Sequence, residues 1–144
     1  MKLIGIDYGK RRIGLAITDE TGQFIRSLPT LDRKTSPRYV STLRALIEQE
    51  QVSQIVVGLP LDPSDLDTAM SHEIRAFAAR LEREAGLPVH FVDESLTSRR
   101  ARDIMLNRKR KHRRNKENID AVAACLILEA HTREKESRIA PEGS

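Results

Sequence analysis

Residues 3–18 read LIGIDYGKRRIGLAIT, two apolar, β-prone runs on either side of a polar turn. The first run ends on the carboxylate Asp7, and the second begins at Ile13. A connection this short joins only antiparallel neighbours, because parallel strands need a long crossover. A third β-prone run, Phe24 to Leu28, follows the turn-forming residues 19–22. The first third of the chain is therefore predicted to be a three-stranded antiparallel meander.

Two later segments carry apolar residues at the helical period. In the first, Ser36 is placed as the N-cap and Pro37 at the first helical position, and the pattern runs to about Gln49. The second covers about 69–84 and stops at Gly86, a residue typical of helix ends. Both segments are predicted to be helices with one buried face.

The run 54–59 is short, β-branched and continuously apolar, the pattern of a strand that is buried on both faces, and 88–92 is a second short strand. Because they alternate with the helices, they are expected to pair in parallel through right-handed crossovers. Further helices are expected over about 97–106 and about 117–131. The fold class is therefore α/β, in the order βββαβαβαα, with five strands, three antiparallel and then two parallel, flanked by helices.

The composition is that of one globular domain. The 144 residues are 39% hydrophobic and 32% charged, with no apolar run long enough for a membrane span. The single cysteine, Cys125, cannot form an internal disulfide, and the four histidines lack the spacing of zinc ligands. We expect a reduced, cytoplasmic protein without membrane contact, with one domain over 1–131 and a polar, flexible tail over 132–144.

The positive charge is concentrated in one segment. Ten Lys and Arg and a single acid lie between Arg99 and Lys116, a net charge of +9 in a chain that carries +4. Such a concentration of positive charge is typical of surfaces that bind polyanions, because Lys and Arg side chains that contact phosphates release condensed counterions. The alternative is a solvated loop without a partner. The candidate nucleic-acid contacts are the basic residues of a loop expected to be mobile, Arg108, Lys109, Arg110, Lys111, Arg113, Arg114 and Lys116, together with Arg11, Arg12, Thr97 and Ser98.

Four acids stand at positions where α/β sheets place their ligands. Asp7 ends the first strand, Asp93 and Glu94 end the last, and Asp120 precedes the apolar stretch 121–128. Because side chains alternate along a strand, only one of Asp93 and Glu94 can face Asp7. A carboxylate beside a buried helix is costly unless it is paired or binds a metal.

Each of these acids also has an ordinary structural explanation. Asp7 stands where a turn-forming aspartate would, and the charge of Asp120 in a first helical turn would be stabilised by the helix dipole. Taken together, and without an obvious Ser-His or Cys-His pair, the acids indicate a site for a hard cation such as Mg²⁺ or Mn²⁺. Such ions can activate water against a phosphodiester, which is nuclease chemistry.

Four blocks of the sequence, in this order, resemble the signature blocks of the YqgF/RuvX family. They are Gly5-Ile-Asp-Tyr-Gly-Lys-Arg-Arg-Ile-Gly-Leu-Ala16, Val57-Gly-Leu-Pro60, Asp93-Glu-Ser-Leu-Thr-Ser98 and Asp120-Ala-Val-Ala-Ala-Cys-Leu-Ile-Leu128. The resemblance extends from about Lys2 to Ala130. Members of this family are RNase H-like proteins associated with Holliday junction resolution and with maturation of the 5′ end of pre-16S rRNA.

The resemblance implies an RNase H-like sheet and a catalytic, metal-binding role for Asp7, Glu94 and Asp120, with Asp93 as the alternative to Glu94. Two positions depart from the family pattern. The family usually has glycine in the loop after Gly-Leu-Pro, whereas residues 61–85 contain none, and Ser95 stands where the family commonly has arginine.

Three functions are compatible with these features. The first is a metal-dependent endonuclease acting on structured RNA or branched DNA, and the second is a nucleic-acid-binding assembly factor without turnover. The third, part of an actin-like ATPase, would need a second domain of the same plan. Cutting both strands of a junction favours a homodimer, whereas trimming one RNA end needs only a monomer.

Overall fold

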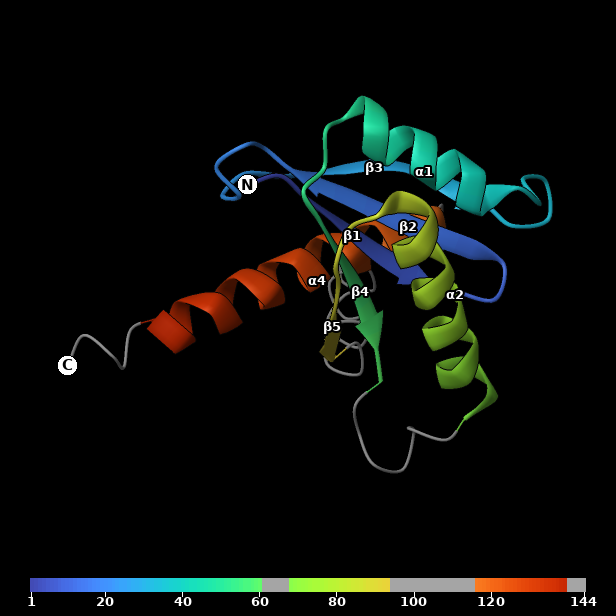
Figure 1. Ribbon diagram of the computed structural model, residues 1–144. Helices are drawn as coiled ribbons and strands as arrows, with labels where there is room; N and C mark the ends of the chain where they lie inside the picture. The colour runs from blue at the N-terminus through green and yellow to red at the C-terminus, as the bar shows by residue number, and fades with distance from the viewer. Residues whose placement is uncertain (61–67, 94–115, 140–144) are drawn as a thin grey trace, which may run out of the picture.

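A computed structural model describes residues 1–60, 68–93 and 116–139, and its strands form a five-stranded mixed sheet in the order β3-β2-β1-β4-β5 (Figure 1). β1 pairs antiparallel with β2 and parallel with β4, β2 pairs antiparallel with β3, and β4 pairs parallel with β5. The predicted meander and the two parallel strands are thus confirmed. The strands are β1 (Leu3–Tyr8), β2 (Arg12–Thr18), β3 (Ile25–Asp32), β4 (Gln54–Leu59) and β5 (Val89–Asp93).

Helices cover both faces of the sheet. Figure 1 shows α1 (Tyr39–Gln49) and α2 (Ala69–Ala85) on one face and α4 (Lys116–Ile139) crossing the other. None of the helices in the described ranges is long and apolar enough to cross a membrane.

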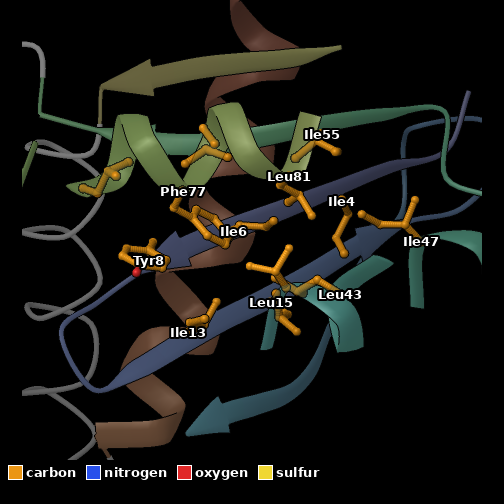
Figure 2. Packing of buried hydrophobic residues seen from close by; sticks show 14 of the residues in the cluster. Ile4, Ile6, Tyr8, Ile13, Leu15, Leu43, Ile47, Ile55, Phe77 and Leu81 are labelled. Atoms are coloured by element: carbon orange, nitrogen blue, oxygen red, sulfur yellow. The ribbon is translucent and has the colours of Figure 1, made fainter. Parts of the chain in front are cut away.

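Strand alternation divides the apolar side chains between the two faces. Figure 2 shows those of Ile4, Ile6 and Tyr8 on the α1/α2 face, together with Ile13 and Leu15 of β2. The α4 face is lined instead by Leu3, Ala16, Val56 and Val92, which pack with Ala124, Ile127 and Leu128 of α4. Asp7 is in step with Leu3 along β1, so its side chain belongs to the α4 face.

Two glycines let α4 lie directly against the sheet. A Cβ on Gly5 of β1 would stand 2.6 Å from Leu128 Cγ and 2.9 Å from the Ala124 carbonyl oxygen. On Gly14 of β2, a Cβ would stand 2.1 Å from the carbonyl oxygen of Asp120. Any side chain at either position would therefore push the helix away from the sheet.

The start of α1 corrects one prediction. The helix begins at Tyr39 with Arg38 as the N-cap, which makes no side-chain capping bond, and not at Ser36 and Pro37. Asp32 forms a turn before the helix, since its carboxylate accepts hydrogen bonds from the Lys34 and Thr35 amides while its carbonyl accepts one from the Ser36 amide. After this turn the backbone of Arg38, with φ of −95° and ψ of 41°, is not helical, so the regular helix begins only at Tyr39.

Two other boundaries also differ from the prediction. β3 continues through Pro29 to Asp32, which is possible because β3 is an edge strand and one side of its backbone needs no partner. α4 continues beyond His131 to Ile139, in a stretch rich in helix-forming Arg, Glu and Lys. The predicted helix over 97–106 lies outside the described residues.

Candidate active site

Asp7 occupies the carboxyl end of β1 as a buried acid, with only 8% of its surface exposed. It is in register with Gly14 of β2 across the antiparallel pair. Gly14 has no side chain, so it leaves the sheet surface beside Asp7 open for α4 to approach. A buried carboxylate persists only where neighbouring groups or a cation compensate its charge.

Asp120 is the fifth residue of α4 and reaches the same place from the helix. Its backbone rests on Gly14, and its side chain is 22% exposed. Arg12 Nε, at the start of β2, donates a hydrogen bond to Asp120 Oδ2 at 3.1 Å. Because Asp7 and Asp120 both adjoin Gly14 on the α4 face, the structure brings these two predicted site residues together.

Asp93 is directed to the other face of the sheet. It is in register with Leu59, whose side chain belongs to the α1/α2 core, whereas the preceding Val92 packs toward α4. Asp93 therefore does not share a face with Asp7. Glu94, the predicted third acid, lies outside the described residues.

The donor set at this edge suits a hard divalent cation. Carboxylate oxygens are the ligands that Mg²⁺ and Mn²⁺ prefer, and Asp7 and Asp120 supply them from a strand end and a helix that meet at Gly14. The described residues alone contain no cluster of three or more His, Cys, Asp or Glu side chains able to hold a metal ion. Asp7 and Asp120 are two members of the predicted triad, and the third is not described.

The basic residues predicted to contact nucleic acid are only partly described. Arg11 is 61% exposed and forms an ion pair of 3.3 Å with Asp32, while the guanidinium of Arg12 is engaged by Asp120. Lys116 is the first residue of α4. The remaining candidates lie outside the described residues: Thr97, Ser98, Arg108, Lys109, Arg110, Lys111, Arg113 and Arg114.

Arg33 is a residue of this edge that the sequence patterns do not single out. Its guanidinium donates to the carbonyl oxygens of Gly9 and Lys10 at 2.9 and 2.8 Å and pairs with Glu73 of α2 at 3.1 Å. It also lies 4.6 Å above the ring of Tyr8, an attractive cation–π geometry. Arg33 thereby fixes the turn that follows Asp7. One arginine among twenty-five basic residues carries no local signal of such a role.

The aromatic partner of Arg33 is uncharged at neutral pH. Burial, together with a hydrogen bond to the Tyr39 hydroxyl, raises the pKa of Tyr8 above its ordinary value. Tyr8 also stacks on Phe77 of α2, with ring centroids 4.2 Å apart. The residue next to Asp7 is therefore anchored in the core, and this restricts the position of Asp7 itself.

A hollow of about 500 Å³ lies elsewhere, around the turn between β2 and β3. Asp19, one of the two acids that line the hollow, accepts hydrogen bonds from the Thr21 hydroxyl and from the amides of Gln23 and Phe24. The hydrogen bond from Thr21 is the main reason that the pKa of Asp19 lies below its usual range. Asp19 thus organises a turn at the end of the meander opposite to Asp7.

The chain is similar in sequence to known proteins over most of its length. The profile of the RuvX family, described as Holliday junction resolvase, matches residues 1–133. A protein of Maridesulfovibrio salexigens is 42% identical over 129 residues, which cover 90% of this chain and 96% of that protein. One of Koribacter versatilis is 40% identical, covering 90% of this chain and 84% of its own length. Both bear the name "Putative pre-16S rRNA nuclease".

Solved structures share the fold at low sequence identity. RuvC of Thermus thermophilus, in complex with a Holliday junction substrate, superposes with a TM-score of 0.61 at 16% identity, over 94% of this chain and 96% of RuvC. The Holliday junction resolvase of fowlpox virus gives a TM-score of 0.52 at 14% identity, over 94% of this chain and 99% of its own. The RNase H-like fold expected from the sequence is thereby confirmed.

Proposed function

The chain belongs to the RuvX family, and on this premise we propose that it is a divalent-metal-dependent nuclease that hydrolyses phosphodiester bonds of structured nucleic acid. The observation that carries the proposal is the buried carboxylate of Asp7, placed with Asp120 around Gly14 at the carboxyl end of β1. We assign the role of third ligand to Glu94. The placement of Asp93 argues against Asp93 as this ligand, because it is in register with Leu59 on the opposite face.

The residues of the proposed site have different roles. Asp7 and Asp120, with Glu94, would hold Mg²⁺ or Mn²⁺, which when bound activates a water and stabilises the leaving oxygen of the phosphodiester. Arg12 orients the Asp120 carboxylate through the bond to Oδ2. Arg33 holds the turn after Asp7, so the end of β1 keeps its position without a ligand.

The substrate that we propose first is the 5′ end of pre-16S rRNA, on the strength of the names that the relatives bear. The second candidate is a Holliday junction, which the family description and the RuvC complex favour. The two differ in the assembly required, since one RNA end needs one active site and a junction needs two. The proposed location is the cytoplasm.

The proposal is tested with the purified full chain on two labelled substrates, a pre-16S rRNA fragment and a four-way DNA junction. We expect cleavage of the RNA with Mg²⁺ or Mn²⁺, and none after EDTA treatment. Adding the metal back should restore cleavage. Tight binding to either substrate without cleavage in any metal would instead establish the assembly-factor function.

A second expectation concerns the basic segment that precedes α4 in the sequence. Replacing Arg110, Lys111, Arg113 and Arg114 by alanine should weaken binding regardless of base sequence. The plot of log affinity against log salt should become flatter, by about 0.9 for each duplex phosphate that is no longer bound or about 0.7 on a single strand. Fluorescence anisotropy over a salt series measures this. A slope equal to that of the wild type would contradict a role of this basic segment in substrate binding.

A further inference from the structure

A second cluster of exposed cations lies at the same edge of the sheet as Asp7. The β1–β2 turn contributes Lys10 and Arg11, and the β3–α1 loop contributes Lys34 and Arg38. Figure 1 shows the two segments next to each other at the right-hand edge, and the Arg33 amide donates to the Arg11 carbonyl at 2.7 Å. We call these four residues the hairpin patch.

The hairpin patch has a fixed backbone. Arg33 of the β3–α1 loop donates hydrogen bonds to two carbonyls of the β1–β2 turn, and its guanidinium is also paired with Glu73. Within the β3–α1 loop, the Asp32 carboxylate accepts a hydrogen bond of 2.8 Å from the Lys34 amide. Because the loops are ordered before any ligand arrives, little conformational entropy is lost on binding.

The charge of the hairpin patch is largely uncompensated. Arg11 pairs with Asp32, whereas the side chains of Lys10, Lys34 and Arg38 form no ion pair within the described part of the chain. The nearby Glu73 is engaged by Arg33. Three solvated cations within two adjoining loops attract an extended anion rather than a single carboxylate.

The surroundings of the hairpin patch favour nucleic acid over a membrane. The exposed large apolar residues of the described chain are Met1, Phe24 and Phe91, and none belongs to the patch. Membrane-surface sites combine basic residues with such apolar side chains. The β1–β2 turn, in contrast, begins two residues after Asp7, and Arg12, which follows it, pairs with Asp120.

We propose that the hairpin patch binds the phosphate backbone of the substrate beside the scissile bond, as a second anchoring surface formed by the β3–α1 loop. The proposal rests on the proposed nuclease function and specifies where its substrate continues beyond the active site. Lys34 and Arg38 are the new contacts, and they supplement Arg11. The ligand chemistry is a chain of phosphodiesters, which RNA and a DNA junction share.

The test uses the double variant Lys34→Ala/Arg38→Ala. Both residues shape the loop through backbone atoms, since the Lys34 amide bonds to Asp32 and the Arg38 carbonyl accepts from Thr42. The matched control is Arg80→Ala/Arg83→Ala, which removes the same charge from exposed positions near the end of α2. Binding to a pre-16S rRNA fragment and to a four-way DNA junction is measured in EDTA over a salt series, and cleavage is measured in parallel.

We expect the patch variant to bind several-fold more weakly than wild type at low salt. Its salt slope should be flatter by about 0.7 for each single-strand phosphate, or about 0.9 for each duplex phosphate, that the patch no longer binds, while the control keeps the wild-type slope. A flattening seen with only one substrate identifies that substrate as the one that reaches the patch.

Equal salt slopes for the patch variant and the control would contradict substrate binding by the hairpin patch, even if the wild type cleaves. If the wild type binds but never cleaves, a flatter slope for the patch variant would support binding by the patch and contradict the nuclease function. A wild type that binds neither nucleic acid would reject both.

Discussion

Asp7→Asn is expected to abolish cleavage while the protein remains folded. The change preserves size and hydrogen-bonding capacity but removes the negative charge that would hold a cation at the end of β1. Loss of groups that merely support a metal ligand costs about 10–100-fold, so the loss of a ligand itself should exceed about 100-fold. Cleavage rates in Mg²⁺ and in Mn²⁺, measured beside a thermal melt, provide the test.

The stability of Asp7→Asn separates a catalytic role from a structural one. Asp7 is buried and close to Asp120, so removing its charge relieves repulsion and should leave the melting temperature unchanged or slightly raised. A marked fall in melting temperature would show that Asp7 serves the fold. Full activity in Mn²⁺ would count against its role as a ligand.

Asp93→Asn is the matched control for Asp7→Asn. It makes the same chemical change at the end of β5, but on the face of the sheet in register with Leu59. We expect it to retain most activity and Glu94→Gln to lose it. The reverse result would transfer the third ligand position to Asp93.

The second large effect is expected from Gly14→Ala, which should inactivate the enzyme through geometry. The added Cβ would stand 2.1 Å from the Asp120 carbonyl oxygen and 2.5 Å from its carbonyl carbon. Both are backbone atoms, so no side-chain rotation relieves the clash. The first turns of α4 must move away from β2, and this displaces the Asp120 carboxylate and strains its bond to Arg12.

Gly5→Ala provides a comparison, because Gly5 of β1 contacts the same helix, α4, at another place. Its Cβ would meet Leu128 Cγ at 2.6 Å and the Ala124 carbonyl at 2.9 Å, farther along α4 from Asp120. Overpacking of this kind costs about 1–3 kcal/mol, so both variants should melt earlier. Assayed well below their melting temperatures, Gly5→Ala should keep much of its activity and Gly14→Ala should not. Equal activities would show that the contact between Gly14 and Asp120 does not position the site.

Much of the fold can be predicted from local patterns. Residues 3–18 alternate two apolar runs around a turn too short for a crossover, and this is sufficient to predict the antiparallel pair that the structure contains. Gly86 ends α2 in the left-handed conformation, with φ of 69°, as its sequence position predicts. These features depend on neighbours within a few residues, so the sequence displays them directly.

The start of α1 differs from the sequence prediction. Ser36 and Pro37 have the sequence of a helix start, but they follow a turn formed by Asp32, and the non-helical backbone of Arg38 delays the helix to Tyr39. Asp32 belongs to β3 and is in register with Arg12 of β2. The sheet therefore fixes where the chain leaves β3, which the local sequence does not display.

The sequence singles out the acids of the candidate site, but their grouping depends on tertiary structure. Asp7 at a strand end and Asp120 before an apolar helix are visible as anomalies, and each has an ordinary structural explanation. Only the packing of α4 on Gly14 places Asp120 next to the cross-strand partner of Asp7. The face to which Asp93 points likewise follows from the register of β5 with β4.

Within the described residues, the sequence by itself determined the order of strands and helices and the chemical types of the candidate site residues, because propensity, periodicity and charge act over short stretches of chain. Tertiary structure alone decided which residues meet. It brought the guanidinium of Arg33 across to the Gly9 and Lys10 carbonyls and joined the Arg33 amide to the Arg11 carbonyl. These contacts join residues more than twenty positions apart, where the pairing of strands and not local preference sets the distance.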